Sequence, residues 1–264
     1  MLFECELSSQ VLHTAARVFV ILPELKASPE GEILPAAEQR FPVLYLYHGG
    51  YDDGSCWVRR TNIERYATEK GLAVVMPSAG NSYYTDAGNG RAYFTFISQE
   101  LPQLVRGIFP LSDKREENFV AGLSMGGYGA FKMALTFPER FGAAVSMSGV
   151  LDIVRRACRP YPGESVTEID FQGIFLQGRT LEGTDDDLFA LLKKHSPEEL
   201  PRLYACCGID DRFLEDNRRF CALAREQGIQ LDYEEAPGNH EWDFWDRHIR
   251  EALDWMLPNA HSSL

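Results

Sequence analysis

The fold of this chain is indicated by one stretch, Asn118-Phe119-Val120-Ala121-Gly122-Leu123-Ser124-Met125-Gly126-Gly127-Tyr128-Gly129. A short apolar run leads into a Gly-x-Ser-x-Gly pattern centred on Ser124, and helix-forming residues follow from position 130 to 135. This order predicts a strand that turns sharply into a helix at a serine, the arrangement called a nucleophile elbow. The pattern alone can occur by chance. Because a strand and a helix are predicted on its two sides, we interpret Ser124 as a nucleophile.

The elbow also predicts roles for the residues around the serine. Its strained turn leaves no room for neighbouring side chains, which accounts for glycine at Gly122 and Gly126. The backbone N–H of Met125 is expected at the N-terminus of the following helix, where it can stabilise a developing oxyanion.

A second apolar run, residues 41–47, is typical of a central strand covered on both faces, and it ends in His48-Gly49-Gly50. In enzymes with a nucleophile elbow, the loop after this strand supplies the second N–H donor to the oxyanion. We therefore predict Gly50 as that donor and Gly49 as a residue that shapes the loop. The alternative is an ordinary turn.

A serine hydroxyl needs a base within hydrogen-bonding reach before it can act as a nucleophile. Among the six histidines, His240 follows a predicted late strand in a Gly-Asn-His turn, whereas His248 lies within a predicted helix and His261 in the tail. His48 precedes the oxyanion glycines, and we expect it to order their loop. His240 is therefore the predicted base.

The acid that orients this base is expected after the strand that ends at Gly208. Asp210 and Asp211 both stand there, and the residues themselves leave the choice between them open. Serine, acid and histidine then all follow strand ends, in the chain order that is typical of α/β-hydrolases.

The remaining sequence alternates strands with helices. Predicted strands cover residues 3–8, 15–22, 41–47, 72–77, 119–121, 143–149, 203–208 and 231–236, and predicted helices cover 59–70, 95–109, 130–137, 214–227 and 243–257. This alternation predicts an α/β fold of the α/β-hydrolase type, with a mostly parallel central sheet and helices on both faces. Residues 150–197 interrupt this alternation of strands and helices, and we predict that they form a small inserted cap. With neither repeat nor linker, residues 1–264 are expected to form one domain.

Composition excludes several classes of partner. The net charge of −13 argues against nucleic acid and against an anionic membrane surface. Because the amino terminus is acidic, we do not expect an export signal. Because no run of about 18 apolar residues occurs, we do not expect a membrane span. The six cysteines show no CxxC spacing and are interpreted as free thiols, so we expect a cytoplasmic location.

A loop rich in glycine and asparagine, residues 78–90, follows the predicted strand 72–77. Loops at the carboxyl ends of sheet strands often determine specificity. Tyr83 and Tyr84 in this loop are candidates for lining the substrate pocket. Packing at the surface is the alternative.

Three motifs carry a resemblance to a known family: residues 122–129, the stretch 207–214 and Gly238-Asn239-His240-Glu241-Trp242-Asp243-Phe244-Trp245. Together they resemble the esterase D family, and most closely its tributyrin-type esterases. S-formylglutathione hydrolases and feruloyl and acetyl-xylan esterases are relatives. The resemblance runs from about residue 40 to the end. It implies Asp211 as the acid and Gly50 and Met125 as the oxyanion donors.

The resemblance also has a departure. The formylglutathione branch carries a Thr-Cys-Thr segment after its oxyanion glycine, where this chain has Tyr51-Asp52-Asp53-Gly54-Ser55. This difference argues against a glutathione thioester as the substrate.

We therefore predict a serine carboxylesterase that hydrolyses a small-molecule ester, and the resemblance implies short acyl chains. The reaction needs neither a metal nor an organic cofactor. The alternatives are a deacetylase or feruloyl-type esterase acting on carbohydrate esters, an S-formylglutathione-type thioesterase, an acyltransferase on the same scaffold, and a silent binding protein. The oligomeric state stays open, and a homo-oligomer is compatible with the sequence.

Overall fold

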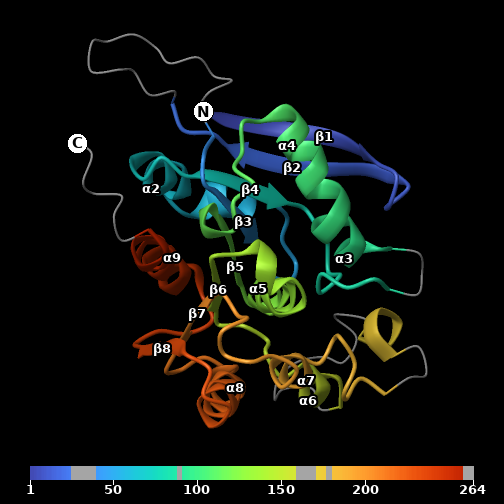
Figure 1. Ribbon diagram of the computed structural model, residues 1–264, viewed down its shortest axis with the longest axis vertical. Coiled ribbons are helices and arrows are strands. Elements are labelled where there is room, and N and C mark those ends of the chain that lie inside the picture. The colour runs from blue at the N-terminus through green and yellow to red at the C-terminus, as the bar shows by residue number, and fades with distance from the viewer. Residues whose placement is uncertain (25–39, 88–90, 159–170, 177–179, 258–264) are drawn as a thin grey trace.

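A computed structural model describes residues 1–24, 40–87, 91–158, 171–176 and 180–257. Its centre is an eight-stranded sheet in the order β1-β2-β4-β3-β5-β6-β7-β8 (Figure 1). The strands are β1 (Leu2–Ser9), β2 (Thr14–Ile21), β3 (Val43–Tyr47), β4 (Ala73–Pro77), β5 (Asn118–Leu123), β6 (Ala143–Met147), β7 (Arg202–Gly208) and β8 (Leu231–Ala236). The β1–β2 and β2–β4 pairs are antiparallel, and the other pairs are parallel. The predicted α/β-hydrolase fold is confirmed.

Burial explains why the central strands were recognisable in the sequence. Every residue of β3, β4, β5 and β6 is buried, as expected of continuous apolar runs covered on both faces. The edge strand β8 instead alternates half-buried and exposed residues along most of its length.

Helices cover both faces of the sheet (Figure 1). They are α1 (Cys56–Arg60), α2 (Ile63–Glu69), α3 (Tyr93–Thr95), the π-helical turn η2 (Phe96–Glu100), α4 (Leu101–Ile108), the 3₁₀ turns η3 (Arg115–Glu117) and η4 (Pro138–Arg140), α5 (Met125–Thr136), α8 (Leu214–Glu226) and α9 (Trp242–Met256). One apolar core contains residues of α1, α2 and α9, and the other contains residues of α4, α5 and α8.

Two predicted helices differ in detail. The helix predicted over 59–70 is two helices, because Thr61 adopts an extended conformation between α1 and α2. The helix predicted over 95–109 starts at the end of α3, continues as η2 and ends as α4. Ile108, which the periodicity placed on its apolar stripe, is exposed at the last turn of α4.

Residues 150–197, which were predicted to form an inserted cap, lie between β6 and β7; we call this segment the excursion. Its described parts hold α6 (Ile153–Cys158), the π-helical turn η5 (Gln172–Leu176) and α7 (Leu188–Leu192), and none of these described residues forms a strand. Asp187 begins α7, because its side chain accepts hydrogen bonds from two backbone N–H groups of the first turn. The buried Lys132 of α5 pairs with Asp186 at 2.5 Å. This pair fixes the excursion to the helix that follows the elbow.

Among the residues described, no helix combines the length and the apolar character that crossing a membrane requires.

Candidate active site

Ser124 lies between the end of β5 and the start of α5, with φ 54° and ψ −118°. Such a positive φ is strained for a residue with a side chain. The flanking glycines permit the turn, since a Cβ on Gly122 would lie 2.3 Å from the oxygen of Gly126, and one on Gly126 would lie 2.4 Å from the oxygen of Tyr47. The predicted strand, strained serine and helix are therefore present.

His240 lies in the turn between β8 and α9. Its Nε2 is 2.9 Å from Oγ of Ser124. The imidazole contacts the rings of Phe213 and Trp245 edge to face, each with a centroid separation of 4.9 Å. These two rings hold the imidazole in the orientation that faces the serine.

Asp211 completes a chain of hydrogen bonds. Its side chain is completely buried, and Oδ2 lies 2.9 Å from Nδ1 of His240. Burial alone would raise the pKa of Asp211, but the hydrogen bond and charge of His240, together with the N–H of Phe213 and the hydroxyl of Ser148, outweigh burial and lower that pKa. Asp211 is therefore a carboxylate at neutral pH. Since a carboxylate only accepts, Nδ1 carries a proton, and in the neutral ring Nε2 is then the acceptor for the hydroxyl of Ser124.

The neighbouring Asp210 lies apart from this chain. Its side chain is exposed, and its N–H donates to the oxygen of Gly238. The two loops that carry Asp211 and His240 also touch here, because a Cβ on Gly208 would lie 2.4 Å from the oxygen of Gly238. The structure thus brings Asp211, and not Asp210, to the histidine.

Ser148 was missed in the sequence. It follows β6 with φ 49°, its hydroxyl helps to lower the pKa of Asp211, and its oxygen accepts from the indole N–H of Trp245 at 3.1 Å. The available signal was the Ser-Gly pair that ends an apolar strand. The interactions themselves cross from β6 to α9 and to the loop after β7, and no local pattern predicts them.

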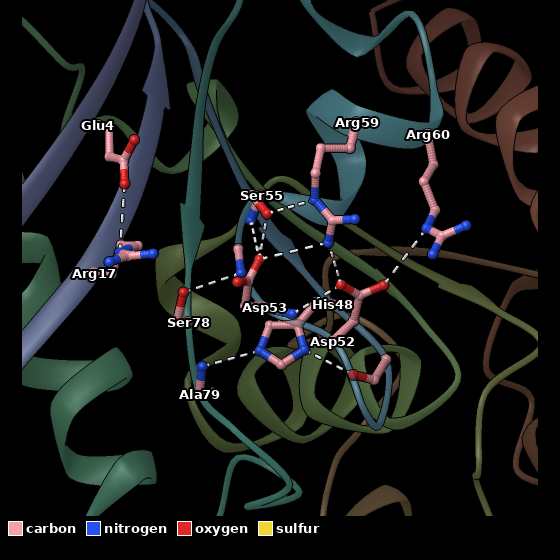
Figure 2. Close-up of polar contacts among 12 residues, drawn as sticks. Glu4, Arg17, His48, Asp52, Asp53, Ser55, Arg59, Arg60, Ser78 and Ala79 are labelled. Carbon is pink, nitrogen blue, oxygen red and sulfur yellow. Dashed lines mark hydrogen bonds and ion pairs between the residues drawn. The ribbon is translucent and has the colours of Figure 1, made fainter.

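His48 orders the loop after β3, as expected. Its ring is fully buried; Nδ1 lies 2.7 Å from the oxygen of Gly49, and Nε2 accepts from the N–H of Ala79 at 2.9 Å (Figure 2). Burial lowers the pKa of His48, so the ring is neutral and Nδ1 is the donor. The histidine thereby ties the loop after β3 to the loop after β4.

The predicted oxyanion residues lie on two sides of Ser124. Met125 is the first residue of α5, so its N–H has no acceptor within that helix. On the other side, a Cβ on Gly49 would lie 3.4 Å from Cβ of Ser124, and the N–H of Tyr51 is already bonded to Asn81. Within the described chain, the N–H of Gly50 has no such partner. The oxyanion roles of Gly50 and Met125 stay predictions.

Ion pairs hold the loop 51–55 that departs from the formylglutathione pattern. Figure 2 shows Asp52 between Arg59 and Arg60 of α1, with the Arg59 pair at 2.6 Å. Asp53 accepts from Ser55, and the N–H of Gly54 donates to the hydroxyl of Ser78. The loop is thus fixed against α1 and the end of β4.

Tyr83 and Tyr84 are buried, with φ of 51° and 50°. The hydroxyl of Tyr84 donates to the oxygen of His48, and its ring stacks on Tyr47 with centroids 4.6 Å apart. Tyr83 packs against Phe175 of the excursion. Tyr84 thus fixes the loop of His48, and a role of either tyrosine in the substrate pocket stays a prediction.

A strained serine at a strand–helix turn, with an acid and a histidine after later parallel strands, defines the chain as an α/β-hydrolase. A family model matches residues 9–256, and the chain belongs to the Esterase family.

Similar proteins cover nearly the whole chain. The acetyl esterase of Caldicellulosiruptor saccharolyticus is 32% identical over 253 residues, which are 94% of this chain and 95% of that protein. The substrate-bound structure of FphF, a fluorophosphonate-binding serine hydrolase of Staphylococcus aureus, is 33% identical with a TM-score of 0.85, covering 97% of this chain and 98% of that one. The S-formylglutathione hydrolase FrmB of the same organism is 32% identical with a TM-score of 0.83 and the same coverage.

Proposed function

We propose that this chain is a serine carboxylesterase that hydrolyses esters of short acyl groups through an acyl-enzyme intermediate. The observation that carries the proposal is the 2.9 Å separation between Nε2 of His240 and Oγ of the strained Ser124. A hydroxyl held against the lone pair of a neutral imidazole is an activated nucleophile.

In the proposed reaction, Ser124 Oγ attacks the ester carbonyl while His240 takes its proton. The carboxylate of Asp211 stabilises the imidazolium that forms, and His240 then protonates the departing alcohol. A water molecule, deprotonated by the same histidine, hydrolyses the acyl-enzyme. The N–H groups of Gly50 and Met125 stabilise the oxyanion in both halves of the reaction.

Short acyl groups are favoured by the surroundings of the serine. Ser124 is only 9% exposed, and the imidazole beside it is enclosed by Phe213 and Trp245. The full-length similarity to an acetyl esterase supports the same size class.

A panel of p-nitrophenyl esters from acetyl to decanoyl tests the proposal. We expect kcat/KM to be highest between acetyl and butyryl, and fluorophosphonate to label the wild type but not Ser124→Ala. Absence of labelling in the folded wild type would contradict a serine hydrolase. A preference for decanoyl esters would contradict only the acyl size.

A thioesterase acting on S-acylglutathione is the second candidate, because the whole chain resembles the S-formylglutathione hydrolase FrmB. The loop 51–55 favours the oxygen ester. Comparing kcat/KM for S-formylglutathione and a formyl ester decides between them, and acetylated or feruloylated sugars test the carbohydrate-ester alternative. Product analysis with added alcohols tests an acyltransferase.

We also propose a cytoplasmic location. The five cysteines for which the structure gives side chains are all free thiols, which supports a reducing compartment.

A further inference from the structure

Three side chains with metal-binding atoms come together from β8 and α9. Glu234 comes from β8, and His248 and Glu251 come from α9. One ligand atom from each residue lies within 4.8 Å of the others. No step proposed for ester hydrolysis involves this cluster.

His248 distinguishes the cluster from an ordinary acidic surface. Its side chain is 1% exposed, and its Nδ1 lies 2.8 Å from the carbonyl oxygen of Phe244. A carbonyl only accepts, so Nδ1 carries a proton, and in the neutral ring Nε2 then has a lone pair for a metal ion. Among the described residues Nε2 forms no hydrogen bond, and it lies 3.7 Å from Oε2 of Glu251. Metal-binding histidines are typically fixed by such a bond from the other ring nitrogen to a carbonyl.

We propose that Glu234, His248 and Glu251 bind a divalent transition-metal ion of the zinc class, with water completing the coordination. Tetrahedral zinc with bonds of about 2.1 Å places its ligand atoms about 3.4 Å apart. The 3.7 Å separation of His248 and Glu251 is already close to this value. Both glutamates are exposed, so their side chains can rotate the remaining distance.

Charge and ligand type select the ion. Two carboxylates repel each other and the imidazole lone pair, and a dication removes this repulsion. An imidazole ligand favours zinc, nickel or copper over magnesium and calcium, which prefer oxygen. The hydroxyl of Tyr204 donates to Oε2 of Glu234 at 2.8 Å and so orients that carboxylate without binding the ion itself.

The position of the site gives the ion a structural role. The turn 237–241, which carries His240, is bounded by β8 before it and α9 after it. An ion held by Glu234 and by two residues of α9 bridges both sides of that turn, next to the bond between Trp255 and Asp232. Metal binding is therefore expected to slow amide exchange in the turn and to raise the Tm.

Isothermal titration of the chelator-treated full chain with Zn²⁺, and with Mg²⁺ as the contrasting ion, tests the proposal. We expect one equivalent of Zn²⁺ to bind much more tightly than Mg²⁺ and to raise the Tm. Glu251→Gln and Glu234→Gln should each weaken zinc binding at least tenfold and abolish the Tm increase. Glu226→Gln, which removes an exposed charge at the end of α8, is the matched control and should bind zinc like the wild type.

These variants keep the test independent of His248, whose replacement could unfold the core. Unchanged zinc affinity in both glutamate variants would place the ion elsewhere, for instance at His240, and would overturn the proposal. Failure of the wild type to bind zinc would overturn it as well. Neither result depends on esterase activity.

Discussion

The completely buried carboxylate of Asp211 lies 2.9 Å from Nδ1 of His240, while the side chain of its neighbour Asp210 is exposed to solvent. Adjacent residues at the end of a strand thus have opposite environments. Because Asp211 keeps its charge in this setting, it fixes both the tautomer and the orientation of the imidazole.

The first prediction separates these two aspartates. Asp211→Asn should lower kcat by on the order of 10⁴-fold with little change in KM, because the imidazole can then adopt the wrong tautomer. Asp210→Asn is the matched control and should keep most of the activity. Kinetics at equal folded fraction check both variants, and an inactive Asp210→Asn would move the acid one residue back.

Replacement of the proposed nucleophile gives the second prediction. Ser124→Ala should lose on the order of 10⁴-fold or more in kcat, because no other group can form the acyl-enzyme. The circular dichroism spectrum and Tm should stay close to those of the wild type. Near-normal ester hydrolysis by the folded variant would show that Ser124 is not the nucleophile.

A third prediction concerns Ser148, which we propose positions the carboxylate of Asp211. Ser148→Ala removes the hydroxyl that helps to lower the pKa of Asp211 and the oxygen that accepts from the indole N–H of Trp245. We expect kcat to fall about tenfold at constant KM, in line with the loss of about 1.5 kcal/mol that charge-assisted hydrogen bonds contribute. Equal rates in the alanine variant and the wild type would show that Ser148 does not position Asp211.

Glycine replacements give the fourth prediction. In Gly126→Ala the new Cβ would lie 2.4 Å from the oxygen of Tyr47, so the elbow and the end of β3 must separate. Destabilisation by about 1–3 kcal/mol or more is expected, together with lost activity. The same change at Gly107, an exposed site in α4 with nothing within 4 Å, should instead stabilise by up to about 1 kcal/mol. Denaturant unfolding measures both, and similar effects at the two sites would contradict the packing argument.

The fifth prediction is a pH dependence of stability that arises from Asp216 in α8. Burial and the nearby charge of Asp152 raise the pKa of Asp216 to about 6, against the pull of Arg155. The folded protein therefore holds this proton more tightly than the unfolded chain. The resulting contribution is fully present below about pH 4 and is lost as the pH rises through about 6, amounting to at most about 3 kcal/mol.

Asp216→Asn cannot ionise, yet its amide oxygen can still accept from Arg155. The unfolding free energy of this variant should fall less between pH 4 and 7 than that of the wild type, by urea denaturation at each pH. Parallel curves for the two proteins would show that Asp216 does not titrate in this range. Glu226→Gln controls for the removal of one negative charge.

The sequence was sufficient to predict those parts of the fold that depend on local chemistry. The apolar run before Gly122 and the paired glycines predicted the elbow, and β8 was predicted with its observed bounds. His240 followed from its place after that strand. The choice of Asp211 over Asp210 needed the family spacing, because alternation along a strand does not tell which face a loop residue takes.

Other features depended on contacts between distant segments. The bond of Ser148 to Trp245 and its effect on the pKa of Asp211 join three elements, so no local sequence pattern predicts them. Tyr84 lies in a loop whose composition is typical of the surface. Its burial depends on the distant bond from its hydroxyl to the oxygen of His48. The break at Thr61 was missed because the flanking residues favour a helix.

The backbone contact between Gly208 and Gly238 joins the loop that carries Asp211 to the loop that carries His240. Because the two loops touch and share hydrogen bonds, Asp211 and His240 shift together when the edge of the sheet moves. Ser124 is instead anchored by β5 and α5. Thermal loosening is therefore expected to lengthen the Ser124–His240 contact before the Asp211–His240 contact, so the proposed nucleophile would separate while the histidine is still paired with Asp211.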